Sequence, residues 1–421
     1  MFLLGFLPIM IIAVGTYVLF KIRFFYILHP IRTLKFAFSG KNTKKSIISL
    51  ILALAGTLGV GNIVGVAFGI YKGGVGSVFW LCISAIFSSA IKYAEVALSS
   101  RYKTGLGIIS VIENIGSHSI KIAKLYALFS LILSFTMGSL LQADAVRTSV
   151  KMLGSINPFP TLTFIFIFTA VICILGKNKI KSAVAAVIPV ATLIYTFMCL
   201  FVIFSEYDRI FYVIRAIISS AFNFSAISGG IFGFLISSGM REGFARGLLS
   251  NEAGAGTSSF SHTSDTDVSE SGTYEQNLSK AGIYGILEVV FDTLLLCPMT
   301  AFAILLGNDN DVFYGTLTEI SNIFEGYLGT AAPFLLLFSI AAFAVSTVLC
   351  WYYYGKTSYS YITNKRFSLI FSFLFLTSFG IGLIFAIPNI IFITDTILFL
   401  MSVITLYTIL KKRKYLFLAK K

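Results

Sequence analysis

Residues 56–66 read GTLGVGNIVGV and lie in the middle of an apolar segment that is otherwise typical of a membrane-spanning helix. Glycine costs about 1 kcal/mol relative to alanine inside a helix, yet this stretch holds Gly56, Gly59, Gly61 and Gly65 beside the amide of Asn62. We therefore expect an interruption of the helix near the bilayer midplane, where open backbone is tolerated only inside protein or beside a wet cavity. Close packing of Gly61 and Gly65 against another helix is the alternative explanation.

The whole chain is strongly apolar. Of its 421 residues, 57% are hydrophobic and only 12% are charged, which is outside the range of soluble globular proteins. A helix crosses a hydrocarbon core of about 30 Å with roughly 20 apolar residues, and eleven such runs are expected, at residues 2–20, 46–70, 75–98, 123–143, 159–176, 181–204, 222–248, 281–306, 328–354, 366–386 and 389–410. The sequence predicts an all-α integral membrane protein with a single transmembrane domain over residues 1–421.

Basic residues fill alternate loops of this predicted arrangement. Lysine and arginine follow the first, third, fifth, ninth and last runs, whereas the loop after the eighth run is acidic. Under the positive-inside rule, this pattern places the N-terminus outside and the C-terminus in the cytoplasm of a multi-pass cell-membrane protein. Membrane orientation therefore explains the net charge of +14, and we expect membrane lipid but no nucleic acid as a partner.

The seventh run contains a second glycine cluster, Gly229, Gly230 and Gly233, and it runs opposite to the second run. Two interrupted antiparallel helices, five runs apart, indicate an inverted-repeat transporter. The repeats then span residues 46–204 and 222–411, and residues 1–45 form an extra N-terminal helix and a basic loop. An interrupted helix offers free N–H groups to a carboxylate and free C=O groups to Na⁺.

Six motifs, in order along the chain, are similar to those of one transporter family. They are GTLGVGNIVGVAFGI (56–70), KGGVGSVFW (72–80), KYAEVALSSRYK (92–103), REGFARGLLSNEAGAGTSSFSH (241–262), FDTLLLCPMTAFAILL (291–306) and FAVSTVLCWYYYGK (343–356). The chain thus resembles the alanine or glycine:cation symporter family (sodium:alanine symporters). Because that family resembles LeuT-type transporters, the resemblance implies a LeuT-like 5+5 inverted repeat with one extra N-terminal helix.

The resemblance also implies sites for the solute and for Na⁺. The solute would contact the main-chain amides at the first interruption, an amide side chain, the second glycine cluster and two aromatic rings: Val60, Gly61, Gln142, Gly229, Gly230, Phe232 and Trp351. Na⁺ would be bound by three carbonyls and two hydroxyls, those of Ala55, Leu58, Phe343, Ser346 and Thr347. Back-bonding of the two hydroxyls to their own helix is the alternative.

Asp292 is a carboxylate within a predicted span, where charged side chains are expensive and usually functional. Thr57 and Asn62 match the position of a second cation site in LeuT-type proteins, so the resemblance implies that Asp292 faces such a site together with them; a hydrogen-bonded strut in the bundle is the alternative. Glu288 precedes Asp292 by four residues, on the same face of a regular helix. The family usually has a small or apolar residue there, so Glu288 is a candidate proton or cation site.

Charged residues at the ends of the third and seventh runs are candidates for an inner gate. Lys92 and Glu95 lie one turn apart near the cytoplasmic end of the third run. We expect the seventh run to bring charged partners to the same side, namely Arg241, Arg246 and Glu252. Anchoring at the membrane interface is the alternative role of these charges.

We expect symport of a small neutral amino acid, alanine or glycine, driven by a sodium gradient through alternating access. The alternatives are a proton-coupled or differently specific transporter of the same fold, and a non-transporting amino-acid sensor. An enzyme is not expected, because the three histidines lie in loops or at span ends and the chain has no HExxH motif. No cofactor is expected beyond Na⁺ as coupling ion. Serine as solute, the preferred enantiomer, Na⁺ against H⁺ and the oligomeric state are left open.

Overall fold

The computed structural model describes residues 6–38, 43–102, 104–154, 157–222, 238–263, 274–308, 313–364, 366 and 368–416. Helices are the only regular secondary structure within these ranges. Seven of the described helical segments are long and apolar enough to cross a membrane, and two shorter apolar helices, α2 (Leu7–Lys21) and α21 (Ser368–Ile384), accompany them. The described part of the chain is therefore all-helical, with the composition of a membrane protein.

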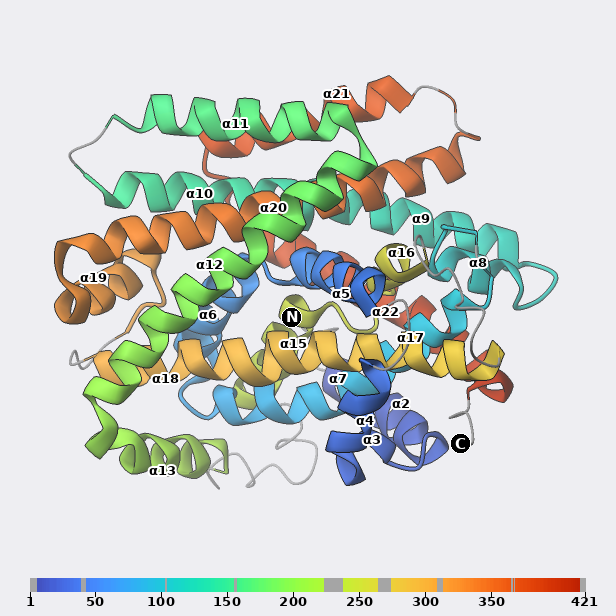
Figure 1. The fold of residues 1–421 in the computed structure, drawn as a ribbon, viewed down its shortest axis with the longest axis horizontal. Coiled ribbons are helices and arrows are strands. Elements are labelled where there is room, and N and C mark those ends of the chain that lie inside the picture. Colours follow the sequence, from blue (N-terminus) through green and yellow to red (C-terminus); the bar gives the residue numbers. More distant parts are fainter. Residues whose placement is uncertain are drawn as a thin grey trace.

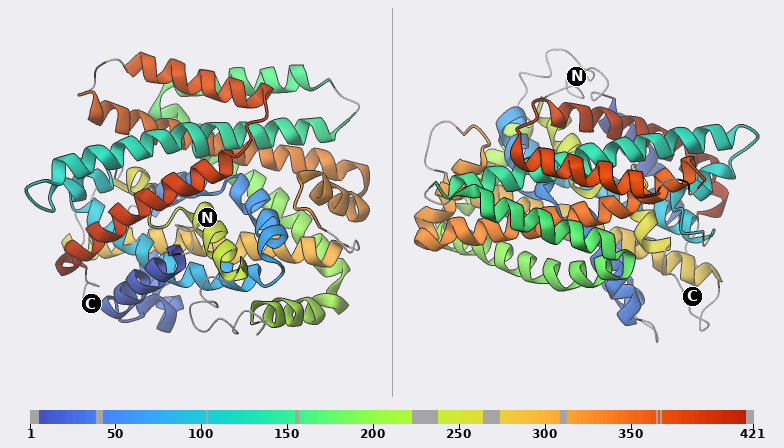
Figure 2. Two further views of the ribbon diagram at one scale, coloured as in Figure 1. Left: turned by 180° about the vertical axis from the view of Figure 1, so that it is seen from behind. Right: turned by 90° about the horizontal axis from the view of Figure 1, so that it is seen from above.

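The long helices lie side by side in a bundle (Figures 1 and 2). Along one edge lie α11 (Pro158–Leu175) and α21; along the opposite edge lie α13 (Ile210–Ala221), α2, α3 (Phe25–Leu28) and α4 (Pro30–Ala37). Between the edges run α7 (Ser77–Ser100), α12 (Lys177–Ser205), α20 (Ala332–Ile362) and α22 (Ile390–Lys411). The short helices α8 (Ile108–Glu113) and α19 (Leu317–Leu328) mark opposite ends of the bundle.

The interruption expected near Asn62 is confirmed. Helix α5 (Thr43–Thr57) ends there, a 3₁₀ turn η1 (Val60–Asn62) follows, and α6 (Val64–Gly73) continues the chain. Gly59 is extended, with φ −114° and ψ −163°. A Cβ added to Gly59 would lie 2.9 Å from the hydroxyl oxygen of Thr347 and 3.3 Å from the amide of Gln142. Glycine at this position therefore lets two side chains reach the open backbone.

A second interruption lies at residues 252–257, between α15 (Ser238–Asn251) and α16 (Ser258–Thr263). Its backbone has positive φ at Glu252 (54°), Gly254 (89°) and Gly256 (78°), which ends the helix. An interruption is also predicted at Gly229, Gly230 and Gly233; those glycines and Phe232 lie outside the described residues, so that prediction is not tested. The predicted run at 222–248 also ended too early, because α15 continues to Asn251 and the chain re-enters a helix at Ser258.

Helices α6 and α15 are antiparallel neighbours, so the two interruptions meet. A Cβ on Gly73 would lie 2.9 Å from Cβ of Glu242, one on Gly69 would lie 3.0 Å from Cγ of Arg246, and one on Gly61 would lie 3.5 Å from Cα of Ser250. The start of α15 therefore lies at the end of α6, which the orientation prediction places outside. Arg241 and Arg246 therefore lie beside the half of α6 that ends at Gly73, and the side of the membrane that this end faces stays a prediction.

Two long helices contain a π-helical turn beside these interruptions. One is η2 (Thr136–Leu140), between α9 (Ser119–Phe135) and α10 (Leu141–Met152); the other is η5 (Val290–Leu296), between α17 (Tyr274–Val289) and α18 (Cys297–Gly307). A π turn holds one extra residue, changes the direction of the side chains that follow and is frequent at functional sites. Here the first π turn directly precedes Gln142, and the second contains Asp292.

Candidate functional site

Helix α20 presents a hydroxyl to the open carbonyls at the end of α5. The Thr347 hydroxyl donates to the carbonyl of Ala55 at 3.2 Å and to that of Leu58 at 3.5 Å. Adjacent oxygens around a hard cation, each about 2.4 Å from the ion, lie about 3.4 Å apart. Phe343 lies one turn before Thr347, and both it and Ser346 are buried. The five predicted sodium ligands thus come from the α5 end and one buried segment of α20.

Gln142 reaches the same interruption from α10. Its side-chain carbonyl accepts a hydrogen bond from the amide of Val60 at 3.3 Å, while its amide nitrogen donates to the carbonyl of Met137 in the π turn at 3.2 Å. The neighbouring Gly61 faces α15. The amide of Val60, which we predicted to bind a carboxylate, is therefore held by Gln142 in this conformation. A bound solute has to share or displace that contact.

Asn62 connects the first interruption to η5. Its side-chain nitrogen donates to Oδ1 of Asp292 at 2.5 Å and to the hydroxyl of Ser250 at 3.1 Å. Ser250 and Thr293 both donate to Oδ2 of Asp292, at 2.6 and 2.8 Å. Oδ1 of Asn62 is buried and has no hydrogen-bond partner within the described residues. The buried Asp292 carboxylate is thus surrounded by donors, with one free amide oxygen beside it.

Thr57, the third residue predicted for the second cation site, is not bonded to this group. Its hydroxyl donates to the carbonyls of Leu54 and Ala53, at 3.2 and 3.4 Å. This is the back-bonding expected of a threonine inside a helix. The structure therefore brings Asn62 and Asp292 together and leaves the Thr57 hydroxyl on its own helix.

Trp351 is fully buried one turn after Thr347, and its position depends on the second interruption. The indole N–H donates to Oε1 of Glu252 at 3.0 Å, and the side chain packs directly on Gly138 of the π turn. The ring also meets Tyr354 edge to face, with centroids 5.6 Å apart. Glu252, predicted as a gate residue, therefore orients the aromatic ring that we predicted to contact the solute.

The five predicted gate residues fall into two separate groups. Lys92 and Glu95 of α7 lie with the second interruption: Lys92 donates to the carbonyl of Asn251 at 2.6 Å, and Glu95 accepts from the amide of Gly254 at 2.6 Å. Glu252 belongs to that same interruption. Arg241 and Arg246 form the other group with Glu242 and Asp395, at the far end of α15. In this conformation the five charges therefore do not form one group, and a single charged gate stays a prediction.

Arg246 ties α15 to α22 through a buried ion pair, with its guanidinium 2.6 Å from Asp395. Asp395→Ala would leave that charge buried with only Glu242, at 3.6 Å. Since breaking a buried pair costs about 3–5 kcal/mol, we expect a loss of about 3 kcal/mol and a lower thermal midpoint in detergent. The half-exposed Asp144, paired with Arg147, is the matched control: Asp144→Ala should cost under about 1 kcal/mol. Equal midpoints for the two variants would contradict the assigned role of Asp395.

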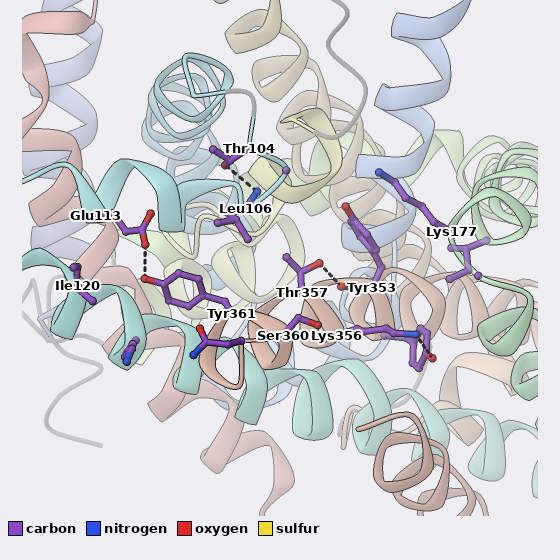
Figure 3. A pocket seen from close by; sticks show the side chains of 16 residues that line it. Thr104, Leu106, Glu113, Ile120, Lys177, Tyr353, Lys356, Thr357, Ser360 and Tyr361 are labelled. Atoms are coloured by element: carbon purple, nitrogen blue, oxygen red, sulfur yellow. Dashed lines mark hydrogen bonds between the residues drawn. The ribbon is translucent and has the colours of Figure 1, made fainter. Parts of the chain in front are cut away.

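A cavity of about 880 Å³ opens at the end of the bundle that carries α8, between α9, α12 and α20. Figure 3 shows Lys177, Lys356 and Tyr353 around it, and Tyr361, whose hydroxyl donates to Glu113 at 2.7 Å. A small second pocket shares Lys177 and Tyr353 and extends to α5 and α16. The sequence analysis did not predict this cavity, because its lining comes from loop-proximal residues of four segments without a common motif.

The inner end of the second pocket is closed by contacts among α5, α16 and α20. The hydroxyls of Ser261 and Tyr354 are 2.6 Å apart, and the Cys350 thiol contacts the carbonyl of Leu52 at 3.5 Å. All four residues line that pocket. These contacts tie α5, α16 and α20 together beside the cavity of Figure 3, with which the second pocket shares Lys177 and Tyr353.

Known proteins similar to this chain are transporters. The model of the sodium:alanine symporter family matches residues 1–419. An uncharacterized transporter from Haemophilus influenzae is 28% identical, covering 97% of this chain and 91% of its own length. The sodium/alanine symporter AgcS from Methanococcus maripaludis is 27% identical, over 92% of this chain and 87% of its own. Among solved structures, a manganese transporter from Eremococcus coleocola aligns at 12% identity with a TM-score of 0.48, over 84% of this chain and 76% of its own.

Proposed function

Because the chain belongs to the sodium:alanine symporter family, we propose that it carries alanine or glycine across the cell membrane together with Na⁺. Cation-coupled transport of amino acids, and not catalysis, is the activity of this family. The contact of the Thr347 hydroxyl with the carbonyls of Ala55 and Leu58 carries the proposal for Na⁺. These hard oxygen donors lie at the negative end of an interrupted helix, which suits a desolvated alkali cation.

The driving force is sufficient for strong accumulation. The solute is a zwitterion without net charge, so the membrane potential acts only on the ion, with about 2.3 kcal/mol per charge at 100 mV. A tenfold Na⁺ gradient adds about 1.4 kcal/mol. One Na⁺ per solute therefore supports accumulation on the order of several hundredfold. Coupling requires that both ligands favour the same state, and one interrupted helix that binds both supplies this link.

We further propose alternating access in a LeuT-like pair of inverted repeats, with eleven spans, an outer N-terminus and a cytoplasmic C-terminus. The contact between the two interruptions, at Asn62 and Ser250, supports a shared site between the repeats. In this arrangement the cavity of Figure 3 is the cytoplasmic vestibule, and the contact of Ser261 with Tyr354 closes the small pocket beside it. Arg246 and Asp395 then close the opposite side.

The second cation site is proposed for Asn62 and Asp292. Two observations support it: the carboxylate is buried at the first interruption, and Oδ1 of Asn62 is free to bind a cation beside it. Trp351 and Gln142 are proposed to limit the size of the solute and to hold its polar groups. A larger solute remains within the scope of the fold, since a Bacillus subtilis relative, 28% identical over 99% of this chain, is named a probable sodium/glutamine symporter.

The decisive experiment is uptake of labelled alanine into proteoliposomes under an imposed Na⁺ gradient, a proton gradient or neither, with unlabelled glycine, serine and glutamine as competitors. We expect Na⁺ alone to drive accumulation, and alanine or glycine to compete best. If alanine accumulates only under the proton gradient, the coupling ion is the proton and not Na⁺. Binding without any accumulation would favour a sensor.

Gln142→Ala is expected to raise the KM for alanine about tenfold or more, with kcat changed much less. The reason is the loss of one hydrogen bond to a charged solute, worth about 1.5–3 kcal/mol. The measurement is initial uptake rate against alanine concentration at saturating Na⁺. Thr148→Ala, which removes a hydroxyl bonded to its own helix on α10, is the control. A KM equal to that of the unmodified protein would assign Gln142 a structural role only.

A further inference from the structure

The lining of the cavity in Figure 3 carries more positive than negative charge. Three lysines line it, each from a different helix: Lys124 of α9, Lys177 of α12 and Lys356 of α20. None of the three ammonium groups forms an ion pair with a carboxylate of the described residues. The acidic side chain of the described lining is Glu113, which accepts a hydrogen bond from Tyr361 at 2.7 Å. The cavity therefore has a positive potential that attracts anions.

Two of the lysines are held against aromatic rings. Nζ of Lys177 lies 5.1 Å from the centroid of the Tyr353 ring, and Nζ of Lys356 lies 5.4 Å from that of Tyr352. Lys356 also donates to the Tyr352 hydroxyl at 3.4 Å. Both lysines are half-buried, so water screens their charges less than those of exposed lysines. A contact with a ring positions an ammonium group and leaves its charge in place, so both groups can bind an anion.

The positive charge is concentrated on the side of the cavity where α12 begins. Gly176 and Lys177 line the cavity there, and α12 has neither an acidic residue in its first turn nor a side-chain cap. The N-terminal end of a helix carries a partial positive charge, which adds to that of the lysine. Figure 3 shows Glu113 and Tyr361 on the other side of the cavity from Lys177 and Tyr353. An anion is therefore favoured at the α12 side.

The charge and the size of this cavity suit a phosphate monoester. Such a group carries up to about two negative charges at neutral pH, which matches two ammonium groups better than a single carboxylate does. Lysine binds phosphate as a point charge. The volume of about 880 Å³ is far more than a bare ion fills and lies in the range of small-molecule sites. We propose that the cavity binds a phosphate monoester, with its phosphate held by Lys177 and Lys356.

Binding at this place affects transport, a consequence that rests on the proposed symport. Lys177 then belongs to the repeat at 46–204 and Lys356 to the repeat at 222–411, and alternating access moves one repeat against the other. A ligand held by both lysines stabilises the arrangement in which both reach it. It also occupies the proposed cytoplasmic vestibule. The bound phosphate monoester therefore keeps the transporter in this conformation and lowers the rate of uptake.

The first test measures binding to the purified protein in detergent and does not depend on transport. The soluble probe is labelled glycerol 3-phosphate in equilibrium dialysis. The lipid probe is phosphatidic acid, which carries the same group on a diacylglycerol, detected by native mass spectrometry with phosphatidylcholine as the reference lipid. We expect one bound phosphate monoester per protein and preference for phosphatidic acid over phosphatidylcholine. Binding of the lipid alone identifies a membrane source, and binding of glycerol 3-phosphate identifies a soluble one.

Lys177→Gln combined with Lys356→Gln should weaken binding at least about a hundredfold, because each lost contact with a charged ligand costs about tenfold or more. Lys121→Gln combined with Lys179→Gln is the matched control. It removes the same charge from exposed lysines of α9 and α12 that lie outside the lining, and it should leave binding unchanged. Lys177→Arg with Lys356→Arg keeps the charge and should keep binding, which separates a lost site from a lost fold. Equal weakening in both glutamine variants, or no binding of either probe, would overturn the site.

The second test is uptake of alanine at saturating Na⁺ in phosphatidylcholine vesicles, with phosphatidic acid in the bilayer, glycerol 3-phosphate on both sides, or neither. The probe that binds should lower the rate of the unmodified protein about fivefold or more and leave the Lys177/Lys356 glutamine variant unaffected. If the probe binds but no vesicle shows uptake, the symport proposal fails while the site stands. Uptake that the bound probe leaves unchanged, or slows equally in the glutamine variant, would overturn the control of transport by this site.

Discussion

Replacing both Ser346 and Thr347 with alanine is expected to abolish Na⁺-driven uptake of alanine while leaving the protein folded in detergent. A hydrogen bond to a charged partner contributes about 1.5–3 kcal/mol, which is a factor of about 10 to 100 in Na⁺ affinity for each lost hydroxyl. Thr347→Ala alone should therefore raise the Na⁺ concentration for half-maximal uptake at least about tenfold. Uptake against Na⁺ concentration, in proteoliposomes, measures both effects.

Ser339→Ala is the matched control for these substitutions. Ser339 is a buried serine of the same helix, and its hydroxyl donates to the carbonyl of Leu335 in the preceding turn at 2.9 Å. The Ser339→Ala variant measures the effect of losing a buried hydroxyl on α20 while the contacts between α20 and the end of α5 stay unchanged. Normal Na⁺ stimulation of uptake in the Ser346/Thr347 double variant would contradict the proposed ion site. An equal loss of Na⁺-driven uptake in Ser339→Ala would contradict it as well.

Asp292→Asn is expected to lower the uptake rate at least about a hundredfold and to reduce the stabilisation of the protein by Na⁺ to the part that the separate site at Thr347 supplies. A ligand that binds only the folded state raises its stability by about 2.7 kcal/mol at a hundred times Kd. The thermal midpoint of the unmodified protein in detergent should therefore rise with Na⁺ concentration, with choline as the reference cation. In Asp292→Asn the carboxylate charge is gone, and the midpoint should rise less with Na⁺ than in the unmodified protein, because only the site at Ala55, Leu58 and Thr347 then binds the ion.

The control separates a cation site from a hydrogen-bonded strut. Ser250→Ala removes one donor to Asp292 but keeps the carboxylate and Asn62. It should lower the midpoint at every Na⁺ concentration by a similar amount and preserve the Na⁺-dependent rise. If Asp292→Asn leaves the size of that rise unchanged, the carboxylate is a strut between η1, α15 and η5.

The first interruption could be predicted because glycines and an asparagine destabilise a membrane-spanning helix, so their presence indicates a functional role. Glycines around Asn62 have no inexpensive structural explanation in an apolar span, and the structure places the break at that point. The second interruption was missed for the opposite reason. Its sequence, SNEAGAGT, contains Glu252 and follows Arg241, Glu242 and Arg246 within ten residues, and charge is normally the sign that a span has ended. Here Glu252 is buried and bonded to Trp351, so the polar segment lies inside the protein.

The partners of the site residues were only partly predictable. The pairing of Thr347 with Ala55 and Leu58 follows from the family motifs, because those residues come from two recognisable segments. The separation of the gate charges into two groups could not be predicted from the sequence, because it depends on which end of α15 lies beside the end of α6. The π turns have no sequence signal that we recognise, although they set the direction of Gln142 and Asp292.

The π turn η5 also gives the two acids of the helix at residues 274–307 separate surroundings. In a regular helix, Glu288 and Asp292 would stack on one face. With the surplus residue beginning at Val290, the halves of the rod are out of phase, and Glu288 meets Lys92 whereas Asp292 meets Asn62. One continuous helix thus places an acid in each of two separate sites. Deleting a single residue within 290–296 would rotate the side chains after the deletion by about 100° relative to those before it.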